Sequence, residues 1–359
     1  MRALHTAPGA RVQLLRHFAY LLAAGFCLAT SSFAAVVPDL YTAQVAVEDR
    51  GTEALAKGAQ AALAQVLVKV SGSDGVLQSN AVNQAMRSAR ARVQTYSYVD
   101  AVAGDQPQVR IEFDADYVTQ LVRQAGAPLW TANRPAVLGW VVVQEDNRRQ
   151  FLNADTDPVL AEQVVAAFSR RGLVLQLPLH DLKDAAALRA SDAWNRNSTL
   201  IKAASERYSV DNVVIARVSP QPDDRYRVDW RYYFGEETLA SSGQVGTVAS
   251  AFQPGADLVA DSMASRYAVA PSSGEPQTVH MLVSGVFEYA DYAGIIRWVR
   301  SLEPIAAADI DRVQGDRLTL RLSTRAQPQS LRNIIELNDK LIPAQGLDST
   351  VALSYRWRN

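Results

Sequence analysis

The densest group of side chains that could do chemistry follows an apolar segment in the middle of the chain. His180, Asp181 and Asp184 come directly after the run Leu173–Leu179. Because histidine titrates near neutral pH, His180 could act as a general base or, with Asp184, bind a metal ion. Alternatively, Asp181 or Asp184 caps the next helix and His180 is a loop residue in solvent. No third ligand or second histidine lies at a metal-binding spacing, so we predict no metal here.

Two other segments resemble binding motifs and also have simpler interpretations. Ser71–Gly75 (Ser-Gly-Ser-Asp-Gly) is glycine-rich, but it closes a helix, whereas a phosphate loop opens one and a nucleophile elbow needs Gly-x-Ser-x-Gly. This segment therefore predicts a helix C-cap. Trp230, Tyr232 and Tyr233, with Arg231 among them, could form an aromatic and basic surface that stacks on a sugar or peptide. The same alternation is typical of a strand with one core face and one solvent face.

No catalytic signature occurs in the sequence. It contains no His-Glu-x-x-His, no Gly-x-Gly-x-x-Gly and no EF-hand loop. A serine–lysine pair stays open, because its partners need not be adjacent in the chain, yet no spacing indicates one. We therefore expect a protein that is not an enzyme and that uses no cofactor.

An α/β domain of residues 134–270 must position the His180 loop. The apolar run Ala136–Val143 predicts a central strand buried on both faces, Asp157-Pro158 starts a helix, and Leu173–Leu177 predicts a parallel strand. These elements form a β-α-β crossover, and open α/β sheets bind ligands at the carboxyl ends of such strands. The remaining predictions are helices at Asp184–Ala190 and Ser198–Tyr208, and strands of a mixed sheet at Asn212–Val218, Tyr226–Phe234 and Thr238–Val248.

Two smaller domains flank the α/β domain. Residues 37–126 read as β-α-α-β-β-α. After a Pro- and Gly-containing linker at 271–276, residues 277–359 read as β-α-β-β-α-β, the ferredoxin-like plan, with the last helix at Pro328–Leu341. The fold class is thus α/β and α+β, with three small domains in series. The ferredoxin-like plan hosts many functions and specifies none.

The first 34 residues predict export. Arg2, Arg11 and Arg16 precede the 13-residue apolar run Phe18–Thr30, and small residues follow, with cleavage expected after Ala34. The alternative is a membrane anchor that is not cleaved, although the run is shorter than the roughly 20 residues of a spanning helix. We expect a periplasmic protein of a Gram-negative bacterium.

Composition restricts the partners of the exported chain. Removal of residues 1–34 takes away three Arg and no acid, which changes the formal charge from −1 to −4. A mildly acidic chain gives no reason to expect nucleic acid as a partner. The single cysteine leaves with the signal, so no disulfide can form, and no later apolar run is long enough to span a membrane.

Several segments together resemble a known family. These are Pro38–Arg50, Ala64–Gly72 (AQVLVKVSG), Arg171–Leu182 (RGLVLQLPLHDL) and Ala203–Arg217. They are similar to a proteobacterial family catalogued as domain of unknown function 2066, over about residues 38 to 270. The resemblance implies an exported envelope protein and transfers no catalytic residue. At the level of fold, the middle domain also resembles small α/β modules of the Tol-Pal protein B and the curli secretion channel protein, which implies protein binding.

Together these features predict a non-enzymatic periplasmic protein of three domains that binds other envelope proteins. The alternative is an envelope hydrolase or small-ligand-binding protein that uses the loop from His180 to Asp184. A third possibility is assembly into an oligomer through the sheets of the domains.

Overall fold

The structure is a computed structural model, and it describes residues 34–99, 106–146, 148–155, 157–270, 275–337, 340–344 and 351–358. The predicted signal segment before Ala34, most of the predicted turn at 103–107 and most of the predicted linker at 271–276 lie outside these ranges. Buried apolar side chains form separate clusters along the chain, which define an N-terminal module (37–129), a middle module (130–268) and a C-terminal module (269–358).

The N-terminal module is a three-stranded antiparallel sheet packed against helices. The strands lie in the order β2-β4-β3. Residues alternate along β4, which buries Val109, Ile111 and Phe113 and exposes Arg110 and Glu112 between them. The elements of this module are β2 (Thr42–Ala46), α2 (Thr52–Ser71), α3 (Asn80–Arg87), β3 (Val93–Val99), β4 (Gln108–Phe113) and α4 (Ala115–Gln124).

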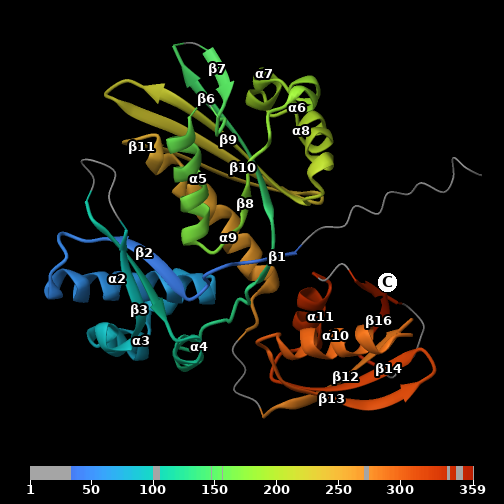
Figure 1. Cartoon of the computed structure of the whole chain (residues 1–359). Coiled ribbons are helices and arrows are strands. Elements are labelled where there is room, and N and C mark those ends of the chain that lie inside the picture. The colour runs from blue at the N-terminus through green and yellow to red at the C-terminus, as the bar shows by residue number, and fades with distance from the viewer. Residues whose placement is uncertain are drawn as a thin grey trace, which may run out of the picture. The chain divides into compact units, whose positions relative to one another are not determined.

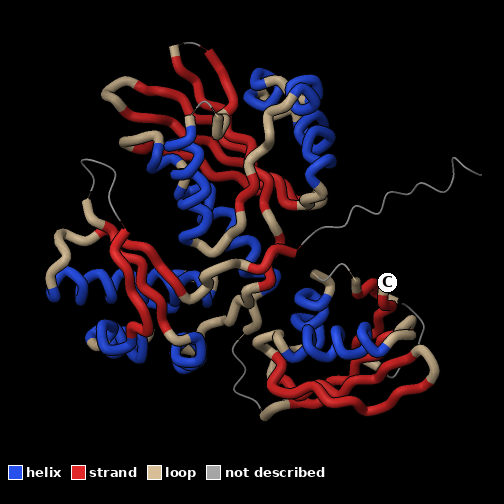
Figure 2. Tube along the Cα trace, viewed as in Figure 1, coloured by secondary structure: helices blue, strands red, loops and turns tan. Residues whose placement is uncertain are grey.

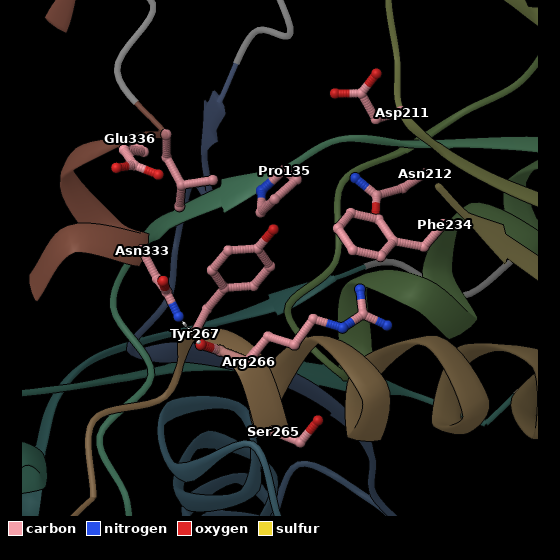
Figure 3. Close-up of a pocket in the computed structure, with 10 residues that line it drawn as sticks. Pro135, Asp211, Asn212, Phe234, Ser265, Arg266, Tyr267, Asn333 and Glu336 are labelled. Carbon is pink, nitrogen blue, oxygen red and sulfur yellow. Dashed lines mark hydrogen bonds between the residues drawn. The ribbon is translucent and has the colours of Figure 1, made fainter. Parts of the chain in front are cut away.

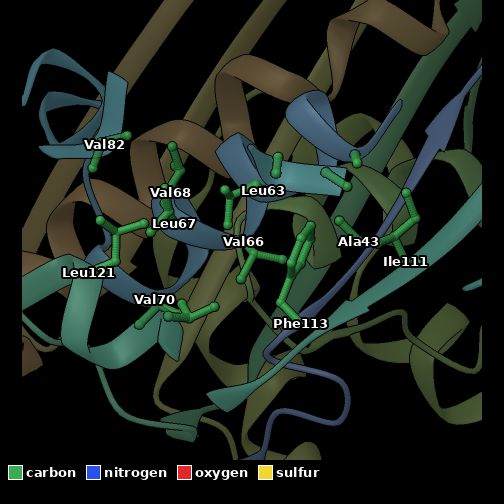
Figure 4. Packing of buried hydrophobic residues seen from close by; sticks show 14 of the residues in the cluster. Ala43, Leu63, Val66, Leu67, Val68, Val70, Val82, Ile111, Phe113 and Leu121 are labelled. Atoms are coloured by element: carbon green, nitrogen blue, oxygen red, sulfur yellow. The ribbon is translucent and has the colours of Figure 1, made fainter. Parts of the chain in front are cut away.

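Helix α2 supplies most of the helical side of this core. Its apolar residues recur every three or four positions, so that Leu63, Val66 and Leu67 are fully buried together (Figure 4). The helix ends at Gly72, whose φ of 76° is left-handed and whose N–H donates to the Val68 carbonyl at 2.8 Å. The predicted helix C-cap is therefore confirmed.

The middle module contains a mixed six-stranded sheet. Its main order is β11-β10-β9-β6-β7, and the central strand β6 runs parallel to β9 and to the short strand β8. The predicted β-α-β crossover is β6-α5-β8. The elements are β5 (Asn133–Pro135), β6 (Val137–Glu145), β7 (Arg148–Phe151), α5 (Pro158–Arg170), β8 (Leu175–Gln176), α6 (Leu182–Ala187), α7 (Ala190–Trp194), α8 (Ser198–Ser205), β9 (Asn212–Gln221), β10 (Arg225–Phe234), β11 (Glu237–Val245) and α9 (Gln253–Tyr267); β5 pairs with β1 (Ala34–Val36).

Helices cover both faces of this sheet. Helices α5 and α9 lie on one face, and α6, α7 and α8 lie on the other (Figure 1). Trp230 and Tyr232 are buried on the first face, and Tyr233 is buried on the second. The suggestion of an exposed aromatic surface on this strand is therefore wrong, because helices exclude solvent from the rings on both sides.

The C-terminal module is a five-stranded sheet whose apolar residues pack against two helices. Val279, Met281 and Val283 alternate on β12, as Leu318, Leu320 and Leu322 do on β14, and all of them face α10 and α11. Figure 2 shows the two helices on one side of the sheet. The elements are β12 (Gln277–Ser284), α10 (Tyr289–Arg300), β13 (Ile305–Gln314), β14 (Arg317–Thr324), α11 (Pro328–Ile335), β15 (Leu341–Pro343) and β16 (Leu353–Trp357).

The topology of this module differs from the predicted plan by one strand. Its order is β13-β14-β12-β16-β15, and β16 runs parallel to β12. The prediction carried the last helix through Leu341, whereas α11 ends at Ile335 and Leu341 begins the additional strand β15. Because β15 is antiparallel to β16, it runs parallel to β14, and the α11 crossover therefore reaches the sheet edge.

No helix in the described part of the chain is both long and apolar enough to cross a membrane.

Candidate functional site

The predicted candidate residues lie where the loop after β8 enters α6: His180 and Asp181 end the loop, and Asp184 is in the first turn of the helix. Asp181 is the N-cap of α6, and its carboxylate accepts hydrogen bonds from the backbone N–H groups of Lys183 and Asp184, both at 3.0 Å. His180 precedes the cap with a φ of 52°, which is left-handed and is found for histidine more often than for most residues with a side chain. The loop is therefore built around a capped helix start.

Asp184, in the first turn of α6, is the buried centre of this group, and its side chain is only 2% exposed. Its Oδ2 accepts hydrogen bonds from the His180 backbone N–H (2.8 Å) and from the Tyr208 hydroxyl, and its Oδ1 accepts one from Arg207 Nη1 (2.8 Å). The Tyr208 hydroxyl in turn accepts a hydrogen bond from the Leu179 N–H at 2.9 Å. We call Leu179, His180, Asp184, Arg207 and Tyr208 the Asp184 network.

The imidazole of His180 packs among aromatic rings. Its ring centroid lies 5.7 Å from that of Trp140 and 5.1 Å from that of Phe151. Its Nε2 is buried and has no hydrogen-bond partner among the residues that the structure describes. Burial lowers the pKa of His180, and the nearby Asp184 carboxylate opposes this effect. The ring is therefore neutral at pH 7 and packs as an aromatic side chain.

Arg207 joins the cap to the network. Its Nη1 and Nη2 donate to the two carboxylate oxygens of Asp181 at 2.6 and 2.9 Å. This hydrogen-bonded pair holds the pKa of Asp181 far below its ordinary value and raises the pKa of Arg207. Burial and the hydrogen bond to Asp184 raise the pKa of Tyr208 to about 12. Asp181 is therefore held as an ionised acceptor, and Tyr208 stays a donor.

This arrangement supports a structural role better than a catalytic one. A general base needs a free lone pair within reach of a substrate proton, but each Asp184 oxygen already accepts from the protein and the free nitrogen of His180 is buried. Arg207 and Tyr208 were not found from the sequence, since they lie more than 20 residues away, and only the packing of α8 beside α6 reveals them. Within the described ranges, no three His, Cys, Asp or Glu side chains are placed to hold a metal ion.

A polar pocket of about 440 Å³ lies elsewhere, where the end of α9 approaches α11 (Figure 3). The Arg266 guanidinium stacks 3.9 Å from the Phe234 ring centroid and lies 3.5 Å from Glu237, and Asn333 Nδ2 donates to the Arg266 carbonyl at 3.0 Å. Burial raises the pKa of Tyr267 and that of Glu336. The volume suits a small molecule. Its lining is Pro135, Asp211, Asn212, Phe234, Ser265, Arg266, Tyr267, Asn333, Glu336 and Leu337.

Arg134 forms a second cluster of buried charge that the sequence did not reveal. Its guanidinium is fully buried, lies 3.6 Å from the Trp130 ring centroid, and donates to the backbone carbonyls of Thr131, Arg171, Gly172, Lys69 and Trp130. Burial lowers the pKa of Arg134 to about 9. Its neighbour Lys69 donates to the Thr42 carbonyl at 2.7 Å, and burial together with Arg134 lowers the pKa of Lys69 to about 8.

The Arg134 cluster ties the N-terminal module to the middle module. The Lys69 carbonyl belongs to α2, whereas the Gly172 carbonyl follows α5. Arg171 adds a second link, since it contacts Asp257, Asp261 (2.7 Å) and, at 3.4 Å, the Gly72 carbonyl. Because carbonyls accept most of these bonds, the cluster fixes the backbone where the two modules meet.

Comparisons with known proteins give a family match for the N-terminal module. Residues 34–131 match a family described as "Domain of unknown function (DUF8605)". This places the module in an uncharacterised family, but it does not support the more specific resemblance to domain of unknown function 2066. No curated protein matches the sequence. Among solved structures, the LpoB C-terminal domain from Salmonella enterica is 14% identical and covers 31% of this chain and 83% of that domain, with a TM-score of 0.22. A TM-score this low supports no assignment of fold or function.

Proposed function

We propose that this chain is a non-enzymatic, exported protein that binds other proteins of the cell envelope. The observation that carries the proposal is the saturation of the Asp184 network. The residues best suited to chemistry by type and spacing are hydrogen-bonded to each other, so a structural role explains why these residue types occur together. The family match to an uncharacterised module is compatible with the proposal and adds no activity to it.

Export remains part of the proposal. It rests on the basic, apolar and small-residue order of the first 34 residues, which is typical of a cleaved signal peptide. The periplasmic location that we propose rests on the same segment. N-terminal sequencing of the protein purified from the periplasm tests this part, with Ala35 expected as the first residue.

The alternative function is an envelope hydrolase or small-ligand-binding protein that uses His180. It has one observation in its favour, the buried His180 Nε2 without a partner. It predicts that His180→Ala abolishes activity or ligand binding while leaving the melting temperature nearly unchanged. The structural interpretation predicts the reverse, because the ring packs against Trp140 and Phe151.

The experiment that tests the binding proposal is crosslinking in cells that express the tagged full chain, followed by mass spectrometry of the crosslinked proteins. We expect a defined envelope partner whose recovery is unchanged by His180→Ala after correction for the amount of folded protein. Hydrolytic turnover by the purified protein that is lost with His180→Ala, together with no partner, would refute the proposal.

A further inference from the structure

We propose that the solvent-facing side of α10 binds an acidic amphipathic helix of a partner protein. This inference rests on the proposed binding function and names the surface and the chemistry of the partner. The side of α10 that faces away from the core carries apolar and aromatic residues.

Helix α10 carries two apolar stripes. Ile295 and Val299 are fully buried in the core of the C-terminal module. Tyr289, Ala293 and Ile296 follow one another at spacings of four and three residues, which aligns them on another side of the helix. A surface helix needs only one apolar stripe to pack on its own domain, so the second one is available for another molecule.

The second stripe is only partly open to solvent, because Ala293 is half-buried and Ile296 also packs against the core of the C-terminal module. Tyr289 is 83% exposed and stacks on Tyr292 with ring centroids 6.3 Å apart. The neighbouring Phe287, at the approach to the helix, is 74% exposed. A hollow of about 370 Å³ follows the helix, and its lining residues are Tyr289, Tyr292, Ala293, Ile296, Arg297 and Arg300, all from α10. Exposed aromatic rings around a small residue are typical of a protein-binding surface.

The charge of this surface selects an acidic partner. The two charged residues that line the hollow are both arginines. Arg300 is partly engaged, since its Nε donates to the Ala308 carbonyl at 3.0 Å and its Nη2 lies 3.9 Å from Asp309. Arg297 is exposed, and its side chain forms no ion pair or hydrogen bond with the described residues. A carboxylate of the partner would pair with Arg297 in bidentate geometry.

The shape of the surface favours a helix over an extended strand or a membrane. The stripe repeats every three and four residues along one helix, which is the spacing that a second helix matches with its own ridges. α10 has 12 residues, or about 18 Å of helix at 1.5 Å per residue. Two arginines near a membrane would contribute only about 1 kcal/mol each, which is a weak attraction for a chain that becomes more acidic after export.

The test places a photo-crosslinking amino acid at Ala293 of the full-length chain in cells. The control position is Leu182, which is 90% exposed on the unrelated helix α6. We expect an adduct specific to position 293, and the crosslinked peptide of the partner should be an amphipathic segment with Asp or Glu within one turn of the crosslinked residue. Arg297→Glu should reduce the yield of this adduct about tenfold, because it replaces attraction by repulsion.

The matched control is Arg87→Glu. Arg87 also lies in the last turn of an exposed helix, so the two substitutions cost similar helix stability. The adduct should be unaffected by Arg87→Glu. An adduct to a second copy of this chain, or an adduct equally strong with Arg297→Glu, would overturn the inference. So would sedimentation of the purified protein with vesicles of phosphatidylethanolamine and phosphatidylglycerol that is lost with Arg297→Glu.

The envelope-binding function and the α10 binding surface can be refuted separately. If general crosslinking still recovers an envelope partner while position 293 gives no specific adduct, the α10 surface is wrong and the binding function stands. If general crosslinking recovers no partner at all, the binding function itself is wrong.

Discussion

Replacement of Asp184 by Ala is the substitution that tests the structural role of the candidate site most sharply. The carboxylate is 2% exposed and accepts hydrogen bonds from the His180 N–H, the Tyr208 hydroxyl and Arg207. Loss of the acceptor leaves the first two donors without a partner at about 1–3 kcal/mol each. Arg207 keeps both bonds to Asp181 and is 29% exposed, so the loss of its bond to Asp184 is screened by solvent and costs little stability.

The expected total is a decrease of about 3 kcal/mol in the free energy of unfolding, since water can reach some of the freed groups. At about 2–4 °C per kcal/mol, the melting temperature should fall by roughly 6–12 °C. The assay is thermal and urea unfolding followed by circular dichroism.

Asp184→Asn is the matched control. It keeps the size of the side chain and one acceptor oxygen but removes the charge, so we expect a loss of about half as much stability. If both variants unfold within about 1 °C of the wild type, the Asp184 network does not stabilise the fold. The residues would then need another explanation, and the His180 alternative would regain support.

Three further predictions follow from buried groups. Gly172→Ala places a Cβ 2.3 Å from Arg134 Nη1. It should lower the free energy of unfolding by well over the roughly 1 kcal/mol expected of Gly126→Ala, because Gly126 has a similar positive φ but no described atom within 4 Å of the added Cβ. Equal unfolding free energies of the two variants would contradict the packing described for Arg134. The pKa of Lys69 is about 8 in the folded protein, whereas that of an unperturbed lysine is about 10.5. The unfolded chain therefore holds the extra proton between these pH values, and stability should rise with pH across this window by about 3 kcal/mol relative to Lys69→Met. Parallel pH profiles of the two proteins would refute this. Since burial lowers the pKa of His180, the unfolded state gains a proton before the folded state does as the pH falls below about 6.5. Acid unfolding should therefore show a loss of stability in this range for the wild type and a smaller loss for His180→Asn. Identical acid midpoints would count against a buried, neutral ring.

Local patterns in the sequence were sufficient where a single segment determines its own structure. Asp181 precedes an apolar-periodic stretch and caps it, and Gly72 ends α2 because its left-handed backbone is accessible to glycine. In both cases the hydrogen bond is closed within a few residues, so neighbours in the chain are enough to infer it.

Contacts between distant segments could not be inferred in this way. The strand expected at Leu173–Leu177 forms only two ladder residues, which pair with Val137 and Leu138 of β6, and β7 pairs with β6 from Val142 onward. Arg134 lies in a polar Asn-Arg-Pro segment that reads as a boundary, and only the fold brings carbonyls from α2 and the end of α5 around it. The strand β15 is three residues long and ends in Pro343, so it has too little pattern to recognise.

The binding function is tested most directly by crosslinking in cells with the wild type, His180→Ala and Arg297→Glu side by side. We predict one defined envelope partner that is recovered with the wild type and, per folded molecule, with His180→Ala, and that is reduced about tenfold with Arg297→Glu. No partner with any of the three proteins, together with a turnover that His180→Ala abolishes, would contradict the account.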